Sequence, residues 1–594
     1  MRLCAICFFP SRDKFTASGD VGHNVLALTG LSKRTTRFAP RTIRKPPRVR
    51  RTPQVPVSAR FPIRLKLPGH PRGKGYQLFF CSYRKMWPTV MKPDQGAAEN
   101  AVDAEGRGPS RSWLYAIWVA MAARLMWYAQ TLAFTDDEGF HLLAAQLIKG
   151  GLRPYLDFCF PQTPLNTYWN AFLMQLFGES WRGPHALAAL ETSAATVLAA
   201  QFVLARLPER AWRVAGAIAA TVMIGCNINL VEFGPLGQAY GISLFTTVCA
   251  FRLATAAVER RGWWLAAVCG AFAGAAAASS MLTAAVAPVL VIWIWRCNRA
   301  AGRWNKTAAF AGGAAIPFLP VLWLAVQSPG VVWFNVAKYQ LYYRVVYWPE
   351  PLTHDLDTMT GWLADPQSLL LGLLAIFGVL YIAKRSAWTR ERRAEFYLCG
   401  WLALGITAEL ALAHPTFGRY FCLVTPLVGI LAVPGLYAIG SRVLQPEKPF
   451  WPVLILSVVC AGALARSICH DVSDSYTWKD YEAVARKVLE VTPPSKQVFT
   501  EEEIYFLIKR RPPAGMEFGY SHKLKLPPAV LAKMHITSED VQKRQLAAGA
   551  FGSAATCDDD MIKEYALDKT FQQKADVNGC SVFWDWERPA PEKE

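Results

Sequence analysis

Residues 418–438 read GRYFCLVTPLVGILAVPGLYA, a stretch in which Arg419 is the only charged side chain. An apolar stretch of about 20 residues is long enough to cross the hydrocarbon core of a bilayer as a helix, and only a helix satisfies its own backbone there. Similar stretches lie at 113–134, 185–205, 211–229, 234–251, 263–279, 281–297, 307–327, 367–383, 396–413 and 450–467. The sequence therefore predicts an α-helical polytopic membrane protein with about eleven transmembrane helices.

The positive charge of the chain is concentrated at its beginning. The formal net charge is +20, but residues 1–92 carry 20 Lys and Arg against only Asp13 and Asp20, and the remainder is nearly neutral. This distribution argues against a nucleic-acid-binding function for the protein. The stretch 33–74 is rich in Pro and Arg and has no apolar periodicity. We therefore expect residues 1–92 to form a disordered basic leader.

Two explanations of this leader remain open. The preferred one is an over-extended reading frame with the true start at Met86 or Met91, because no secretory hydrophobic region precedes a cleavage site. The other is a basic cytoplasmic arm that contacts anionic lipid.

The loops between the predicted helices alternate in charge. Short basic connections occur around 206–213, 252–261, 296–306, 384–393 and 442–448, whereas 135–184, 228–233, 328–366 and 413–417 are poor in Lys and Arg. The positive-inside rule assigns the basic set to the cytoplasm. We therefore expect a multi-pass protein of the inner or plasma membrane with a cytoplasmic N-terminus and an extracytoplasmic C-terminus.

The same pattern predicts the domain organisation. Residues 93–112 form a cytoplasmic lead-in, 113–469 a transmembrane domain with a long outside loop at 135–184, and 470–594 a small extracytoplasmic α/β domain. The expected elements of that domain are a helix at 478–490, a strand at 496–500, a helix at 502–509 and a strand at 581–585. Cys557 and Cys580 would pair in an oxidising compartment.

The long outside loop begins with the sequence TDDEG at 135–139, which places Asp136, Asp137 and Glu138 at the water boundary. One interpretation is a helix N-terminus, where carboxylates are favourable. The other is catalysis: a carboxylate near the membrane surface accepts the proton of an acceptor hydroxyl while a phosphate leaves. The acidic residues 501–503 are interpreted only as the first turn of a helix.

The residues that follow carry a family resemblance. Residues 150–158 read GGLRPYLDF and residues 161–165 read PQTPL. Together with the acidic start of the loop, they resemble the first outside loop of the GT-C superfamily of membrane glycosyltransferases. Its members include protein O-mannosyltransferases, aminoarabinose transferases of lipid A and galacturonosyltransferases of lipopolysaccharide core. The resemblance covers about residues 113–520.

The resemblance implies a GT-C-like fold and roles for several residues. Asp137 would be the catalytic acidic residue, supported by Glu138 or Asp136, and Asp157 in the GGLRPYLDF motif would contact substrate. It also implies an inverting single displacement.

Arg419 follows the sequence HPTFG at 414–418, at the start of an apolar run where an unpaired guanidinium is costly. Arginine matches phosphate geometry. The resemblance implies that Arg419 binds the lipid phosphate, with His414 and Tyr420 beside it. The alternative is that Arg419 extends to the membrane interface.

Further outside candidates are less specific. Lys338 and Arg344 lie in a tyrosine-rich stretch, NVAKYQLYYR at 335–344, that would either bind phosphate or belong to an interfacial aromatic belt. Glu232 would act with Asp137 as a metal ligand or orient the acceptor, or it is an ordinary turn residue. The sequence leaves the cofactor open and admits a divalent cation. The sequence HDLD at 354–357 is a weak metal signal.

The predicted function is transfer of a sugar from a polyprenyl-phosphate donor to an envelope acceptor, namely lipid A, a glycan or a protein. The sequence contains no P-loop, no Gly-rich dinucleotide fingerprint and no cytoplasmic Asp-x-Asp, which favours a lipid-linked donor over a nucleotide sugar. The alternatives are a lipid-sugar transporter or flippase and a non-catalytic envelope-assembly protein. A transporter would more often show mid-membrane charges or repeat symmetry.

Overall fold

The computed structural model describes residues 110–260, 262–298, 300–348, 351–386, 388–443, 449–474 and 476–587. All of them belong to one compact unit, Pro93–Glu594. The predicted leader at 1–92 and the lead-in up to residue 109 lie outside the described residues.

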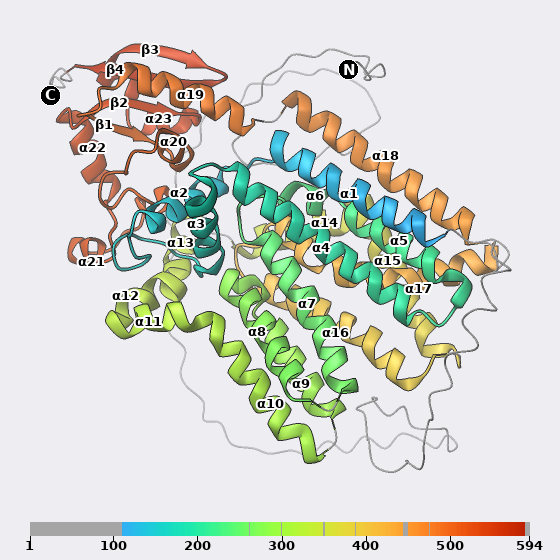
Figure 1. The fold of residues 1–594 in the computed structure, drawn as a ribbon. Helices are drawn as coiled ribbons and strands as arrows, with labels where there is room; N and C mark the ends of the chain where they lie inside the picture. The colour runs from blue at the N-terminus through green and yellow to red at the C-terminus, as the bar shows by residue number, and fades with distance from the viewer. Residues whose placement is uncertain are drawn as a thin grey trace, which may run out of the picture. The chain divides into compact units, whose positions relative to one another are not determined.

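Most of the chain is helical (Figure 1). The helices of the first half are α1 (Arg111–Thr131), α2 (Asp137–Lys149), α3 (Leu165–Phe177), α4 (Arg182–Arg206), α5 (Arg213–Gly225), α6 (Ile228–Phe233), α7 (Tyr240–Glu259), α8 (Trp264–Ser279) and α9 (Val286–Cys297). Those of the second half are α10 (Ala300–Ala315), α11 (Leu319–Gln327), α12 (Pro329–Trp333), α13 (Tyr339–Tyr347), α14 (Pro351–Ala364), α15 (Pro366–Lys384), α16 (Arg390–Leu412), α17 (Thr425–Val443) and α18 (Phe450–Asp474).

Seven helical stretches in the described ranges are long and apolar enough to cross a membrane: Arg182–Arg206, Tyr240–Glu259, Gly302–Gln327, Pro366–Lys384, Arg390–Leu412, Gly418–Val443 and Phe450–Val472. Four predicted spans fall short of that standard. Trp264–Ser279 and Met281–Cys297 are shorter apolar helices. α5 has 13 residues, about 20 Å of helix against a core of about 30 Å. α1 is long enough but less apolar, since it contains Arg124. The count of eleven therefore stays a prediction.

Glycine brings α15 and α17 into backbone contact. A Cβ on Gly435 would lie 1.9 Å from the carbonyl oxygen of Leu374, and one on Gly378 would lie 2.0 Å from that of Leu431. Only a residue without a side chain allows helices to approach this closely. This contact fixes α17, whose N-terminal end follows the short 3₁₀ helix η5 (Gly418–Val424) that contains Arg419.

The C-terminal segment contains a four-stranded sheet in the order β1-β2-β4-β3, formed by β1 (Gln497–Thr500), β2 (Phe551–Thr556), β3 (Phe571–Val577) and β4 (Cys580–Trp586). β1 and β2 are parallel, and the other neighbours are antiparallel. The helices of this segment are α19 (Trp478–Val491), α20 (Glu502–Ile508), α21 (Pro528–Lys533), α22 (Glu539–Ala547), α23 (Asp559–Glu564) and α24 (Leu567–Thr570). A disulfide joins Cys557 to Cys580.

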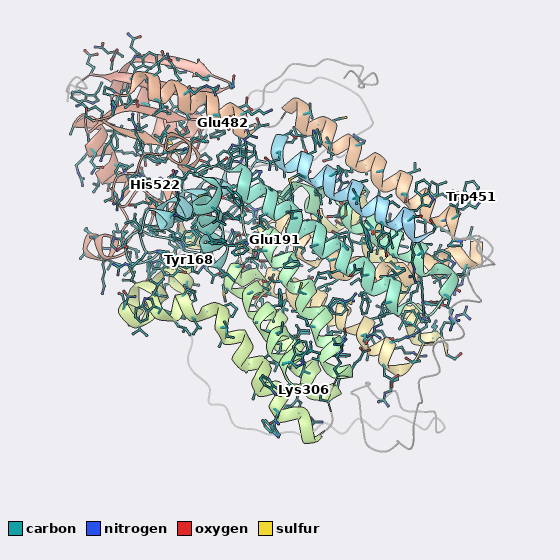
Figure 2. The ribbon with its side chains drawn as sticks, in the orientation of Figure 1. Tyr168, Glu191, Lys306, Trp451, Glu482 and His522 are labelled. Atoms are coloured by element: carbon teal, nitrogen blue, oxygen red, sulfur yellow. A yellow bond between two sulfur atoms is a disulfide. The ribbon has the colours of Figure 1, made fainter. Side chains whose placement is uncertain are left out.

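The first outside loop and the C-terminal segment share one hydrophobic core. Phe140 and Phe158 from the loop pack in the same buried cluster as Tyr339 of α13, Trp478 of α19 and Tyr505 of α20. Figure 1 shows α2 and α3 beside α20. Figure 2 labels Glu482 of α19, which accepts a hydrogen bond from the Trp181 indole at 3.0 Å. The loop is therefore held in place by the C-terminal segment as well as by the membrane helices.

Candidate active site

Asp137 and Arg419 form an ion pair between the first residue of α2 and the start of η5. These two residues come from opposite halves of the chain. Asp137 is 24% exposed and Arg419 is 23% exposed, so neither side chain is sealed from solvent. The structure thus brings together the carboxylate and the guanidinium that the sequence analysis selected for different reasons.

Arg419 has hydrogen-bonding capacity beyond this pair. Its guanidinium carbon lies 4.8 Å from the ring centre of Phe417 and 5.9 Å from that of Tyr420. Its Nε atom is buried and has no hydrogen-bond partner among the described residues. A guanidinium offers five N–H donors in a planar fork. An anion that enters here would therefore find an unpaired donor next to the one that holds Asp137.

Acidic residues of the C-terminal segment approach the same place. A Cβ on Gly139 of α2 would lie 2.2 Å from Glu503 Oε1, which shows how closely α20 packs on α2. Burial, followed by the charge of Asp137, raises the pKa of Glu502. Burial raises the pKa of Glu501 to about 7. The triplet 501–503 received no functional interpretation from the sequence, because only the tertiary fold brings it to Asp137.

The three adjacent carboxylates of the loop have different surroundings. Asp136 is exposed. The surrounding protein nevertheless removes part of the water around its carboxyl group, and this desolvation, followed by the charge of Asp137, raises the pKa of Asp136. Glu138 is fully buried. Its carboxylate accepts hydrogen bonds from the Gly237 backbone N–H and, at 3.0 Å, from the Trp478 indole. Glu138 therefore joins α2 to the segment before α7 and to α19.

His185 completes the surroundings of Glu138. Its Nδ1 lies 2.6 Å from the Ala129 carbonyl oxygen, and its Nε2 lies 2.6 Å from Glu138 Oε1. Because a carbonyl only accepts, Nδ1 carries hydrogen, and Nε2 faces the carboxylate of Glu138. The arrangement suits a positioning role: Glu138 anchors the helix whose first residue is Asp137.

His414 and the loop before Arg419 are held by Asp355, which is 2% exposed. Asp355 pairs with His414 Nδ1 and accepts a hydrogen bond from the Thr416 N–H at 2.5 Å. His354 Nε2 lies 3.1 Å from the Thr416 carbonyl oxygen. The sequence 354–357, set aside as a weak metal signal, thus contributes a buried carboxylate that shapes the approach to η5. Because Asp355 and Thr416 lie far apart in the chain, the sequence did not predict this contact.

A cavity of about 750 Å³ lies beside Phe417 and Tyr420, the residues that flank Arg419. Phe417 and Tyr420, which flank the guanidinium, line it together with Gln340, Tyr343 and Arg344. Arg344 donates to the Ala413 carbonyl, and its Nε is buried without a partner among the described residues. Apolar residues around 281–288 and 405–412 form much of the remaining wall.

The other sequence candidates are exposed or form contacts of their own. Lys338 is exposed. Asp157 forms a surface ion pair with Arg153 at 2.9 Å. Glu232 accepts a hydrogen bond from Ser467 at 3.1 Å, and burial, followed by the charge of Asp471, raises its pKa to about 7. Their roles in substrate or metal binding stay predictions.

Comparison with known proteins identifies the fold. No protein-family model and no curated protein sequence matches the chain. The crystal structure of ArnT from Cupriavidus metallidurans bound to undecaprenyl phosphate matches with a TM-score of 0.53 at 14% sequence identity, covering 80% of this chain and 98% of that one. The apo structure of the same ArnT matches with a TM-score of 0.52, also at 14% identity and with the same coverage.

These matches confirm the GT-C resemblance at the level of the fold. The chain therefore shares the overall fold of ArnT. Together with the long apolar helices, the shared fold indicates a multi-pass membrane protein.

Replacing Glu138 tests whether this residue stabilises the fold. We expect Glu138→Ala to lower the free energy of unfolding by about 3 kcal/mol or more, because it leaves the buried donors of Gly237 and Trp478 without an acceptor and removes the partner of His185. Asp136→Ala, on the exposed neighbour, should change stability by less than about 0.5 kcal/mol. Thermal unfolding in detergent compares the two, and equal stability of both variants would contradict the anchoring role of Glu138.

Proposed function

We propose that this protein is a glycosyltransferase that moves a sugar from a polyprenyl-phosphate donor to an envelope acceptor on the extracytoplasmic face of the membrane. The observation that carries the proposal is the accessible ion pair of Asp137 with Arg419, which places a base and a phosphate-binding group in one site. The fold supports it, because one of the matching ArnT structures contains undecaprenyl phosphate.

The chemistry follows from the two charged groups. A donor phosphate binds the guanidinium of Arg419, including its unpaired Nε–H, and releases Asp137 from the ion pair. The freed carboxylate accepts the proton of the acceptor hydroxyl as the acceptor oxygen bonds to C1 of the sugar. The bond between C1 and the phosphate oxygen breaks, and the electron pair leaves with the phosphate, which Arg419 stabilises. A single displacement of this kind inverts the configuration at C1.

The cavity next to Arg419 has the properties that the donor requires. Its wall is largely apolar, as a polyprenyl chain needs, and it contains one cation, Arg344, and one carboxylate, Glu409. Tyr343 and Tyr420 add aromatic faces suited to a sugar ring. Asp137 and Glu232 remain the proposed ligands of any divalent cation that takes part.

Two independent features support an extracytoplasmic site. Basic loops alternate with loops poor in Lys and Arg, which puts the loop at 135–184 outside. The disulfide between Cys557 and Cys580 lies in the C-terminal segment, which shares a hydrophobic core with that loop. Disulfides persist in oxidising compartments. The proposed orientation therefore has a cytoplasmic N-terminus and an extracytoplasmic C-terminus.

Thiol labelling tests this orientation. In intact cells, a membrane-impermeant maleimide should label Cys557 and Cys580 only after an impermeant reductant opens the disulfide. Labelling of Cys557 that needs permeabilised cells but no reductant would place the C-terminal segment in the cytoplasm and contradict the proposal.

An activity assay tests the function. Purified protein in lipid nanodiscs is incubated with radiolabelled polyprenyl-phosphate sugars and envelope extract. Asp137→Asn should lower the transfer rate about 100-fold or more, because the base is removed while the fold is kept. Arg419→Gln should weaken donor binding, seen as a raised KM. Glu490→Gln, at an exposed pair with Lys487, is the matched control.

The outcomes separate the alternatives. Transfer that survives Asp137→Asn unchanged would rule out this carboxylate as the base. Movement of the lipid-linked sugar across the bilayer without any transfer product would favour the transporter.

A further inference from the structure

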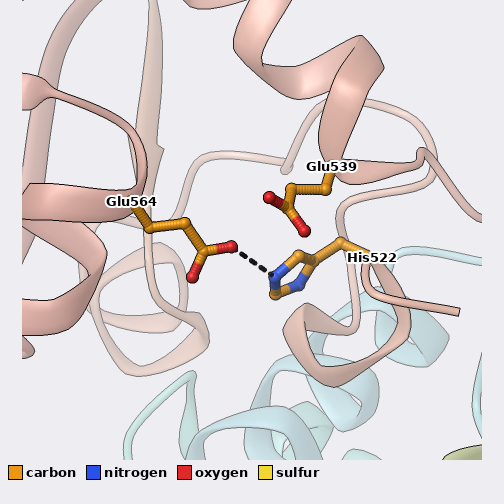
Figure 3. A group of neighbouring side chains, drawn as sticks. All are labelled: His522, Glu539 and Glu564. Atoms are coloured by element: carbon orange, nitrogen blue, oxygen red, sulfur yellow. Dashed lines mark ion pairs between the residues drawn. The ribbon is translucent and has the colours of Figure 1, made fainter. Parts of the chain in front are cut away.

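His522, Glu539 and Glu564 converge in the C-terminal segment (Figure 3). His522 follows the 3₁₀ turn Gly519–Ser521, Glu539 is the first residue of α22, and Glu564 is the last residue of α23. One nitrogen or oxygen atom of each side chain lies within 4.8 Å of the others. Figure 2 labels His522, which lies away from the membrane helices.

The imidazole of His522 presents a free lone pair to the two carboxylates. Its Nδ1 bonds the Gly519 carbonyl oxygen, so Nδ1 carries the hydrogen of a neutral ring. Its Nε2 is buried, has no hydrogen-bond partner among the described residues and lies 4.0 Å from Glu564 Oε1. A metal-binding histidine commonly donates its other N–H to a backbone carbonyl in this way.

Three acceptor groups that face one another are unfavourable unless a cation lies between them. The separation of 4.0 Å is too wide for a hydrogen bond between His522 and Glu564. Ligand atoms around a tetrahedral zinc ion lie about 3.4 Å apart, as metal–ligand distances of about 2.1 Å require. Small side-chain adjustments therefore convert this arrangement into a coordination site.

Two lysines neutralise the carboxylates in the absence of an ion. Lys523 Nζ lies 2.8 Å from Glu564 Oε2, the oxygen that does not face His522, and Lys543 pairs with Glu539. Their side chains are 35% and 40% exposed. Ion pairs at this exposure contribute little, so either lysine turns to solvent at small cost.

We propose that His522, Glu539 and Glu564 bind one divalent transition-metal ion of the zinc type, with water in the remaining coordination positions. One imidazole and two carboxylates are a ligand set that such ions accept. The site is separate from the proposed glycosyltransferase chemistry and does not depend on it.

The site would fix the segment that connects it to the candidate active site. The Glu539 backbone N–H bonds the His522 carbonyl at 3.1 Å. Two residues before His522, the Tyr520 carbonyl accepts hydrogen bonds from Tyr339 at 3.0 Å and Tyr347 at 3.3 Å. The Tyr520 ring lies 6.5 Å from that of Tyr343, which lines the cavity of the candidate active site. The ion would have a structural role.

Zinc binding by the full-length protein tests the proposal. Protein purified in detergent is stripped with EDTA, dialysed and titrated with Zn²⁺ by calorimetry. We expect one tight equivalent per chain, and at least a 10-fold loss of affinity in both His522→Ala and Glu564→Gln. Lys543→Ala should tighten binding, because it removes a competing cation.

Three controls make the result decisive. Asp560→Asn removes a carboxylate from α23 outside the cluster and should leave zinc binding unchanged. Asp137→Asn should also leave it unchanged, which excludes the candidate active site as the source. If circular dichroism shows that His522→Ala or Glu564→Gln does not fold, Glu539→Gln is used in its place. Full zinc binding in folded ligand variants, or no uptake by the wild-type protein at micromolar Zn²⁺, would overturn the proposal.

Discussion

The Asp137–Arg419 ion pair is the contact on which the organisation of the site depends. It joins the start of the loop at 135–184 to η5, which precedes α17 and lies far away in the chain. An exposed pair of this kind would add little stability. Here, however, neighbouring contacts hold each partner in position. The buried carboxylate of Glu138 anchors the helix that begins with Asp137, and Asp355 fixes the loop before Arg419. A pair held in this way is suited to exchange, because a phosphate can replace the carboxylate at the guanidinium without rearranging the fold.

The C-terminal segment helps to position the residues of the candidate active site. Trp478 of α19 donates to Glu138, and α20 packs closely on Gly139 of α2. The segment therefore covers the loop that contains Asp137 and adds the acidic residues 501–503 to its surroundings.

The sequence was informative where neighbouring residues alone determine the free-energy cost of a conformation or a location. Long apolar stretches predict membrane helices, and a guanidinium at the start of an apolar run predicts a partner for Arg419. The sequence could not separate the roles of Asp137 and Glu138, because adjacent positions on a helix differ by about 100° in direction and only the packing decides which is buried. Asp355 and the cluster around His522 were missed, since their partners lie far away in the chain. The short helices α5 and α9 show that an apolar stretch need not be α-helical throughout.

A structure of the protein with a bound polyprenyl phosphate tests the central claim most directly. Cryo-electron microscopy in lipid nanodiscs would locate the phosphate. We expect it within hydrogen-bonding distance of the Arg419 guanidinium, with the Asp137 carboxylate displaced from the ion pair yet still facing the same cavity. A phosphate bound elsewhere, with the Asp137–Arg419 pair intact, would contradict the account.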